Sequence, residues 1–360
     1  MIIEESAPAS EAASQPSALA YPAARRDAQS DTLFGSAVAD PYRWLETDVR
    51  NAPEVREWVT AQNQVTNAFL STLPGRDALK ARMTQLYNYE RIATPRKKGN
   101  RYFYQRNSGL QNQSPLYVRD SLNGAERLLA DPNKWSQDGA TALAEWAPSE
   151  DGKHLAYAIQ DGGSDWRTVK VIDVATGQPT ADEIKWVKFS GLSWAKDNSG
   201  FYYSRYAEPS AGATFQQLNV NQQVYFHKLG TPQSADTLVY ATPDRPELNH
   251  GAEVSDDGRW VVVTSSSGTD DRYEVVLIDR SKRTANKRVL IPGFKNNYSF
   301  IGNRGQTFYF ITNDGAPRLK IVSMNIAAVR PTPVTVVAED AAHREEQAAR
   351  ARSVGLWAGE

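Results

Sequence analysis

Cysteine is absent from this 360-residue chain, so disulfides, thiolate zinc sites and cysteine nucleophiles are excluded. Its absence fits a reducing cytoplasm, which is the predicted location, although a periplasmic protein with its signal peptide removed can also lack cysteine. No run approaches the ~18 apolar residues of a membrane span. Charge of one sign is not in excess either, since 41 basic and 42 acidic residues give a net charge of −1. Nucleic acid and anionic membranes demand a basic surface and are therefore not predicted as partners.

The first 20 residues are rich in Ala, Ser, Pro and Glu. They lack both an early basic residue and the apolar stretch of a secretory signal. Residues 1–20 are therefore interpreted as a flexible lead-in.

What the sequence does contain is one layout used repeatedly. In three places a Gly is followed by a short apolar or aromatic strand, and a second strand ends in Asp 21 residues after that Gly. The three pairs are Gly99 with Asp120, Gly152 with Asp173, and Gly258 with Asp279. Two looser copies begin at Gly200 and Gly305, so the five glycines lie 53, 48, 58 and 47 residues apart. Repeats of ~40–50 residues are typical of propeller blades, which predicts a mainly β fold built as a β-propeller of four-stranded antiparallel blades.

Other segments fall outside this repeat. Helical spacing of apolar residues predicts amphipathic helices over residues 53–72 and 77–87, each of which needs a partner surface. Residues 40–46, Asp-Pro-Tyr-Arg-Trp-Leu-Glu, are expected to be ordered and to dock on another part of the protein. The polar stretch 206–223 indicates a loop excursion, and the Ala-, Arg- and Glu-rich residues 341–360 form a tail that does not resemble a blade.

Catalytic residues are not evident from the residue chemistry. An α/β-type serine hydrolase needs Gly-x-Ser-x-Gly, and the nearest match, residues 191–195 around Ser193, lacks the second Gly. The four histidines, His154, His227, His250 and His343, are not connected by any metal-ligand spacing. His154 and His227 lie in predicted blade strands and are expected to be structural. The Asp residues of the Asp-Gly turns do not form a complete calcium loop, so plain turns are favoured. No cofactor and no metal are predicted.

Several longer motifs resemble the prolyl oligopeptidases, a family of proline-specific serine peptidases, in order from about residue 21 to about residue 338. They are residues 40–46, 97–104 (Lys-Lys-Gly-Asn-Arg-Tyr-Phe-Tyr), 109–113 (Gly-Leu-Gln-Asn-Gln), 149–152 (Ser-Glu-Asp-Gly), 163–166 (Gly-Ser-Asp-Trp), 187–190 (Val-Lys-Phe-Ser) and 251–259 (Gly-Ala-Glu-Val-Ser-Asp-Asp-Gly-Arg). The resemblance implies an N-terminal segment and a C-terminal α/β-hydrolase domain, with a seven-bladed propeller between them in sequence that caps the active site.

On that resemblance we expect residues 21–86 to be the N-terminal helical segment that packs on the hydrolase domain. Residues 87–340 would be about five of the seven blades, and the hydrolase domain with its Ser, Asp and His would be absent. We therefore expect no catalytic residue in this chain, and a frameshift or truncation would explain the tail from residue 341.

The resemblance also implies four substrate-binding residues in the propeller. Phe189 matches a family aromatic that lines the pocket beyond the proline site, although its spacing alone favours a core aromatic. Asn249 and Thr269 fall where better-known members carry Met and Cys. Ser266 falls where members commonly have an Arg that holds the substrate, and a serine cannot supply that fixed charge. Peptide anchoring is therefore expected to be weaker or to come from elsewhere.

The function implied is that of a serine endopeptidase that cleaves short peptides after proline, with the chain carrying the gating propeller but inactive alone. Its expected partners are short proline-containing peptides and the hydrolase domain of a full-length parent, with the chain otherwise a monomer. The loop 206–223 corresponds to a family loop thought to move during substrate entry. Two alternatives stay open: a non-catalytic propeller that binds a partner, and a fragment with bare apolar faces and open strand edges that does not fold stably.

Overall fold

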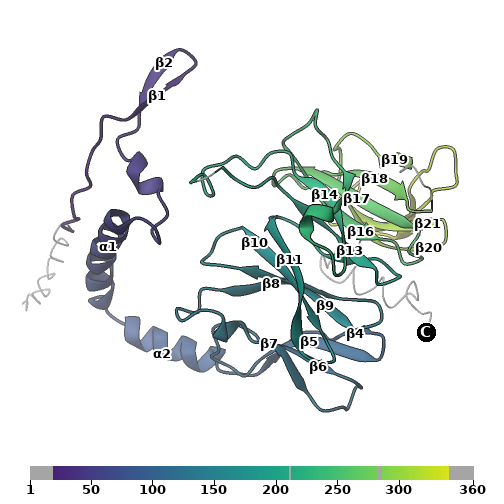
Figure 1. The fold of residues 1–360 in the computed structure, drawn as a ribbon, viewed down its shortest axis with the longest axis horizontal. Helices are drawn as coiled ribbons and strands as arrows, with labels where there is room; N and C mark the ends of the chain where they lie inside the picture. The colour runs from purple at the N-terminus through teal and green to yellow at the C-terminus, as the bar shows by residue number, and fades with distance from the viewer. Residues whose placement is uncertain (1–18, 211, 282–285, 340–360) are drawn as a thin grey trace, which may run out of the picture. The chain divides into compact units, whose positions relative to one another are not determined.

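The computed structural model describes residues 19–210, 212–281 and 286–339, which fall into two compact units (Figure 1). The first unit contains residues 19–86 together with the described part of Pro209–Gln217. The second contains Tyr87–Glu208 and residues 218–339. Most of the predicted lead-in and all of the predicted tail, with His343, lie outside the described residues. Within the described chain, no helix combines the length and apolarity needed to cross a membrane.

The first unit is built from a hairpin and helices. Its elements are β1 (Ser30–Leu33), β2 (Ser36–Ala39), the 3-10 helix η1 (Arg43–Glu46), α1 (Pro53–Ser71) and α2 (Arg76–Tyr87). The two predicted helices are confirmed, and Pro53 begins α1, where its missing N–H leaves no hydrogen bond unmade. The docking predicted for residues 40–46 is also confirmed. Trp44 meets Trp58 of α1 edge-on, with ring centroids 6.4 Å apart, and its indole N–H donates to the Arg25 carbonyl at 3.0 Å.

Part of the loop excursion belongs to this same unit. The Gln216 side-chain amide donates to the Glu46 carbonyl at 2.9 Å, just after η1. The Arg50 guanidinium lies 5.8 Å from the centre of the Phe215 ring. The loop is therefore grouped with the N-terminal helices although its sequence lies between strands of the second unit.

The second unit consists of antiparallel meanders in sequence order. In the first, β3 (Arg91–Ile92) and β4 (Arg96–Lys98) both pair with β5 (Arg101–Asn107), followed by β6 (Leu116–Arg119) and β7 (Arg127–Ala130). The others are β8 (Ala142–Pro148), β9 (His154–Gln160), β10 (Arg167–Asp173) and β11 (Gln178–Val187); β12 (Ser193–Trp194), β13 (Gly200–Arg205), β14 (Gln223–Lys228) and β15 (Thr237–Tyr240); β16 (Leu248–Val254), β17 (Trp260–Ser267), β18 (Glu274–Asp279) and β19 (Asn286–Ile291); and β20 (Tyr298–Arg304), β21 (Thr307–Thr312), β22 (Lys320–Asn325) and β23 (Val334–Val337). Two 3-10 turns, η2 (Pro132–Lys134) and η3 (Gln233–Ala235), lie in the connections.

The Gly-to-Asp spacing reflects the register of the two middle strands of a meander. In the fourth meander Asp279, at the end of β18, lies opposite Trp260, the first residue of β17. The Asp279 carboxylate accepts from the Arg259 guanidinium at 2.9 Å, and the hydroxyl and N–H of Ser281 donate to its other oxygen. Asp120 pairs in the same way with Arg101 at 2.8 Å. In the second meander Asp173 lies opposite His154 and accepts from Thr176 instead, so the feature common to the three repeats is the strand register and not the ion pair.

The apolar core lies between consecutive meanders. Each of four buried clusters draws side chains from two neighbours in the series, so the sheets pack face to face as propeller blades do. Examples across the four junctions are Phe103 with Leu155, Val171 with Phe201, Tyr202 with Val263, and Leu277 with Phe308. The predicted mainly β fold is confirmed. The second and third meanders also share backbone pairing, because Val187 of β11 lies opposite Arg205 of β13 and joins them in one eight-stranded sheet.

Candidate functional site

The end of β11 and the turn that follows it carry two aromatic residues in an uncommon backbone conformation. Trp186 has φ = 61° and Phe189 has φ = 53°, in the left-handed region that bulky side chains rarely adopt. Such conformations cost on the order of 1–3 kcal/mol each and persist only where the surroundings hold them. Phe189 is 45% exposed, so burial of its ring does not explain the strain. It is a surface aromatic and not the core aromatic that spacing alone favoured.

One buried side chain fixes this segment. The amide of Gln222 donates to the Lys188 carbonyl at 2.7 Å and to the Phe189 carbonyl at 3.4 Å. Its side-chain oxygen accepts from the backbone N–H of His250, on β16, at 2.5 Å. The Tyr206 N–H donates to the Trp186 carbonyl at 3.1 Å. The backbone carbonyls of this turn therefore accept hydrogen bonds from the Gln222 side chain and from the Tyr206 N–H.

Aromatic side chains gather around Lys188. The Trp166 ring contacts Trp186 and Tyr206 edge-on, at centroid distances of 5.6 Å and 6.1 Å. The Lys188 ammonium lies 4.5 Å from the centre of the Trp166 ring and 5.6 Å from that of Phe189. We call Trp166, Trp186, Lys188, Phe189 and Tyr206 the Trp166 cluster. Its faces are suited to apolar and ring-shaped groups such as proline, and its single charge is positive.

Asn249 is joined to this cluster. The Tyr206 hydroxyl donates to the Asn249 side-chain oxygen at 2.5 Å, and burial raises the pKa of Tyr206 to about 12, so it remains a neutral donor. Asn249 on β16 lies opposite Ser266 on β17 in the strand register. Three of the four predicted residues, Phe189, Asn249 and Ser266, are therefore connected through the cluster and one strand pair.

Thr269 stands apart from them. It lies in the turn after β17 and is exposed. Within the described chain no hydrogen bond joins it to the Trp166 cluster. Its predicted role stays a prediction, as do those of the other three.

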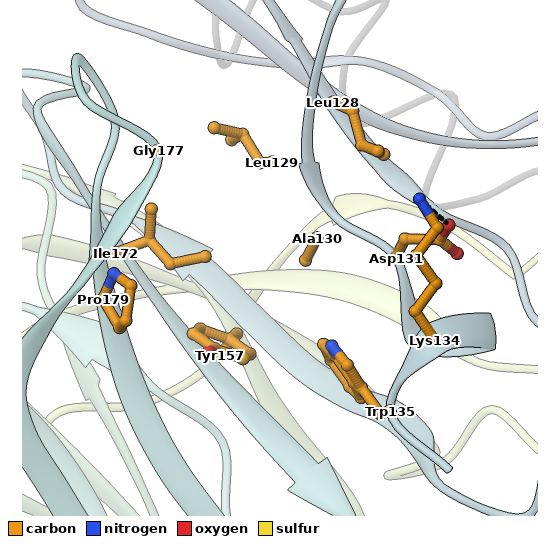
Figure 2. A pocket seen from close by; sticks show the side chains of 10 residues that line it. All are labelled: Leu128, Leu129, Ala130, Asp131, Lys134, Trp135, Tyr157, Ile172, Gly177 and Pro179. Atoms are coloured by element: carbon orange, nitrogen blue, oxygen red, sulfur yellow. Dashed lines mark ion pairs between the residues drawn. The ribbon is translucent and has the colours of Figure 1, made fainter. Parts of the chain in front are cut away.

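A separate pocket of about 290 Å³ lies between the first and second meanders (Figure 2). Its walls are mostly apolar, and a Lys134–Asp131 ion pair stands at one side. It is lined by Leu128, Leu129, Ala130, Asp131, Lys134, Trp135, Tyr157, Ile172, Gly177 and Pro179. None of the four predicted residues belongs to it.

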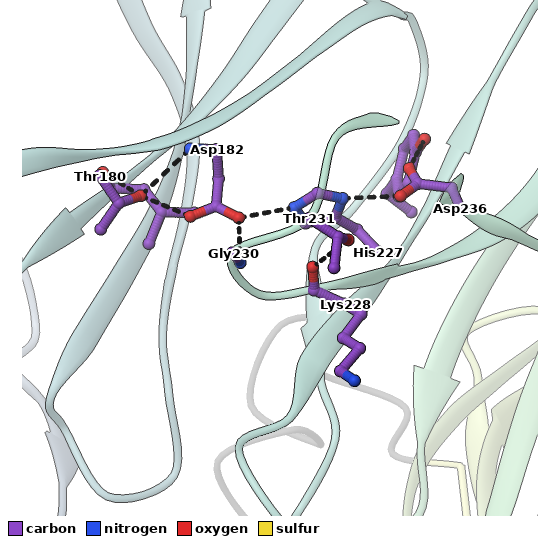
Figure 3. A network of polar contacts seen from close by, with 9 residues as sticks. Thr180, Asp182, His227, Lys228, Gly230, Thr231 and Asp236 are labelled. Carbon is purple, nitrogen blue, oxygen red and sulfur yellow. Dashed lines mark hydrogen bonds and ion pairs between the residues drawn. The ribbon is translucent and has the colours of Figure 1, made fainter. Parts of the chain in front are cut away.

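A buried histidine links the second and third meanders (Figure 3). The His227 ring lies between two carboxylates, with Nε2 2.9 Å from Asp182 and Nδ1 2.7 Å from Asp236. Burial alone would lower the pKa of His227, but the hydrogen bonds to both carboxylates outweigh it and raise that pKa. All three side chains are closed to solvent, so the group connects β11 to β14 and the segment after η3 and cannot meet a substrate. The structural role expected for His227 is confirmed.

A second buried histidine contacts a serine without forming a catalytic triad. His250 Nδ1 lies 2.8 Å from the Ser265 hydroxyl, but Nε2 faces the Thr242 hydroxyl at 3.1 Å, where a triad would have a carboxylate. Both His250 and Ser265 are fully buried, and burial lowers the pKa of His250 to about 4. Ser193 accepts from the Val254 N–H. No Ser–His–acid triad is present in the described ranges, and no cluster of three or more His, Asp or Glu there could hold a metal.

Sequence reasoning missed the residues that surround Phe189. Trp166 and Lys188 both lie in motifs that carry the family resemblance, and their motif membership was the available signal. Gln222 gave none, because a glutamine in a polar stretch indicates exposure and only the fold shows it to be buried.

Comparison with known proteins gives a consistent result along most of the chain. A family model described as the prolyl oligopeptidase N-terminal β-propeller domain matches residues 21–353. A prolyl endopeptidase of Elizabethkingia meningoseptica is 38% identical over 308 residues, covering 86% of this chain and 43% of that protein. One from Elizabethkingia miricola is 36% identical over 322 residues, covering 89% and 45%.

Solved structures show the same relationship. A prolyl endopeptidase structure from a study of inter-domain dynamics is 48% identical, with a TM-score of 0.65. The match covers 89% of this chain and 46% of that one. Prolyl oligopeptidase B from Galerina marginata, bound to a 35-residue hydrolysis and macrocyclization substrate, is 28% identical with a TM-score of 0.72. That match covers 89% of this chain and 48% of the other. The chain thus spans about half the length of the relatives it matches.

Proposed function

Because the chain belongs to the prolyl oligopeptidase family, we propose that it forms the substrate-entry half of a serine peptidase that hydrolyses short peptides after proline. The observation that carries this proposal is the Trp166 cluster. It presents an exposed, backbone-strained Phe189 beside Trp166 and Lys188 and connects it to Asn249. Aromatic faces bind the proline ring and its neighbours, while the Asn249 amide offers N–H donors to peptide carbonyls.

The domain division follows from the same reading. Residues 1–20 would be a lead-in, 21–86 the helical segment, 87–340 a part of the propeller with about five blades, and 341–360 a tail. The helical segment supports a further contact, because Leu79, Met83 and Leu86 of α2 are all about half exposed or more. A helix face of this kind needs a partner surface, and we assign it to a catalytic α/β-hydrolase domain of a full-length parent. The peptide bond would be cleaved by that domain's serine, through an acyl-enzyme.

Peptide binding by the chain tests this function. Blocked peptides acetyl-Gln-Gly-Pro-amide and acetyl-Gln-Gly-Ala-amide are titrated into the protein and followed by NMR, which detects millimolar affinities. We expect the proline peptide to bind more tightly than the alanine peptide. Phe189→Ala should weaken binding about tenfold through the lost ring contact, whereas Leu238→Ala, an exposed residue of β15, should not change it. Equal affinity for the two peptides would count against the proposal.

A further inference from the structure

Lys188 carries a charge that no carboxylate among the described residues contacts. Its ammonium donates to the Asn219 side-chain oxygen at 3.0 Å and lies over the Trp166 ring. Among the described residues it forms no ion pair, and the Asp165 carboxylate acts on it only from beyond contact distance. Burial lowers the pKa of Lys188, with the Asp165 charge opposing that shift. A half-buried ammonium without a carboxylate partner is costly, and an anion bound beside it would reduce that cost.

The position of this charge is built and not incidental. Lys188 stands between Trp186 and Phe189, both of which have a left-handed backbone conformation. Its carbonyl is held by Gln222, and its aliphatic stem leads onto the face of Trp166. The ammonium is therefore held beside the exposed ring of Phe189, and since it has three N–H donors and Asn219 is its hydrogen-bond acceptor among the described residues, a donor is available to a further acceptor. A group bound against Phe189 would come within reach of that donor.

The opposite side of the candidate site offers no comparable charge. Ser266 is neutral, and Asn249 opposite it already accepts from Tyr206. Lys188 is the one cation of the Trp166 cluster, and among the described residues the Asp165 carboxylate is the charge that acts on it. Charge recognition at this site therefore depends on Lys188.

We propose that Lys188 is a specificity-determining residue that selects peptides with a carboxylate side chain on the amino side of the proline. The inference rests on the proposed function, because it needs a peptide seated against Phe189. A carboxylate there gains a hydrogen bond in which both partners are charged, whereas the matching amide offers a neutral acceptor without the charge–charge attraction, and a lysine side chain is repelled.

The test uses three peptides that differ in a single group. Acetyl-Glu-Gly-Pro-amide, acetyl-Gln-Gly-Pro-amide and acetyl-Lys-Gly-Pro-amide are titrated into the chain at neutral pH. Both ends are blocked, so the Glu peptide carries one negative charge, the Lys peptide one positive charge and the Gln peptide none. We expect the Glu peptide to bind about five- to tenfold more tightly than the Gln peptide at low salt, and the Lys peptide to bind least. High salt should reduce the difference between Glu and Gln.

Variants locate the effect. Lys188→Met keeps an unbranched apolar side chain against Trp166 and should bring the ratio of Glu-peptide to Gln-peptide affinity down to about one. Lys188→Arg should retain the preference. Lys185→Met, at an exposed lysine of β11 three residues before Lys188, should behave as the unmodified chain does. A chain that binds Glu and Gln peptides equally, or a preference that survives Lys188→Met, overturns the inference while leaving the proposed function intact. If no proline peptide binds better than its alanine counterpart, both fall.

Discussion

His227 and His250 are both buried, but they make stability depend on pH in opposite directions because their ring nitrogens contact different groups. His227 is flanked by two carboxylates, so its pKa is raised, and the stability it contributes is lost as pH rises through that raised value. His250 meets only the hydroxyls of Ser265 and Thr242. Hydroxyls do not stabilise the imidazolium as carboxylates do, and burial therefore keeps this ring neutral.

His250 leads to a pH-dependence prediction. Its pKa is about 4 in the folded chain, below the ordinary value of 6.5, so the unfolded chain takes up a proton first as the pH falls. The stability due to neutral His250 is complete above about pH 6.5 and is lost progressively as pH falls towards 4, by at most about 3 kcal/mol. Urea unfolding of the chain and of His250→Gln at pH 7, 5.5 and 4 measures this. The variant should lose less stability on acidification by up to that amount.

His154→Gln is measured in the same series, so that a histidine replacement at a half-buried position on β9 is compared with the one at fully buried His250. The contribution of His227 is present in all three proteins and cancels in the comparison. If His250→Gln follows the same acid dependence as the unmodified chain, His250 is not buried in its neutral form.

At the scale of strands, two backbones approach so closely at one position that only glycine fits there, although its place beside a turn suggests a different reason for the glycine. Gly200 begins β13, where a Cβ would lie 1.9 Å from the His227 carbonyl oxygen on β14. It is required for this contact and not for a left-handed turn, which Asn198 supplies with φ = 60°. Gly200, which marks one of the two looser copies of the repeat, is therefore needed for the packing of β13 against β14.

Substituting this glycine tests that reading. Gly200→Ala should lower the free energy of unfolding by about 1–3 kcal/mol, since the clash is with backbone and the strands must shift. Gly191→Ala is the control, because a Cβ there meets nothing within 4 Å and the backbone is not left-handed. That substitution should change stability by less than about 0.5 kcal/mol. Equal effects of the two substitutions in denaturant unfolding would contradict the strand contact.

The same scale shows how much of the structure was predictable from sequence. The Gly-to-Asp repeat was readable because both of its ends lie in one hairpin, so Trp260 opposite Asp279 fixes a local spacing. The helices were readable from their periodicity. The setting of Phe189 was not, because it depends on Trp166, Gln222 and His250, which are separated from it by tens of residues and are joined only by the fold. The grouping of Phe215 with Arg50 was hidden for the same reason.

At the scale of the whole molecule, our proposal places recognition and chemistry in different parts of the sequence of a full-length parent. The chain matches the propeller model and spans about half the length of its relatives. Its described residues carry an aromatic site with a single charge, and the serine–histidine contact among them is sealed from solvent. In our account this polypeptide therefore binds peptides and leaves the bond intact.

Incubation of the chain with a blocked glycyl-prolyl p-nitroanilide, with and without a serine-directed phosphonate, tests that account most directly. We predict no release of p-nitroaniline above the buffer rate, and no serine labelled by the phosphonate in mass spectra of the intact protein. Turnover that the phosphonate abolishes, together with stoichiometric labelling of one serine of this chain, would contradict it.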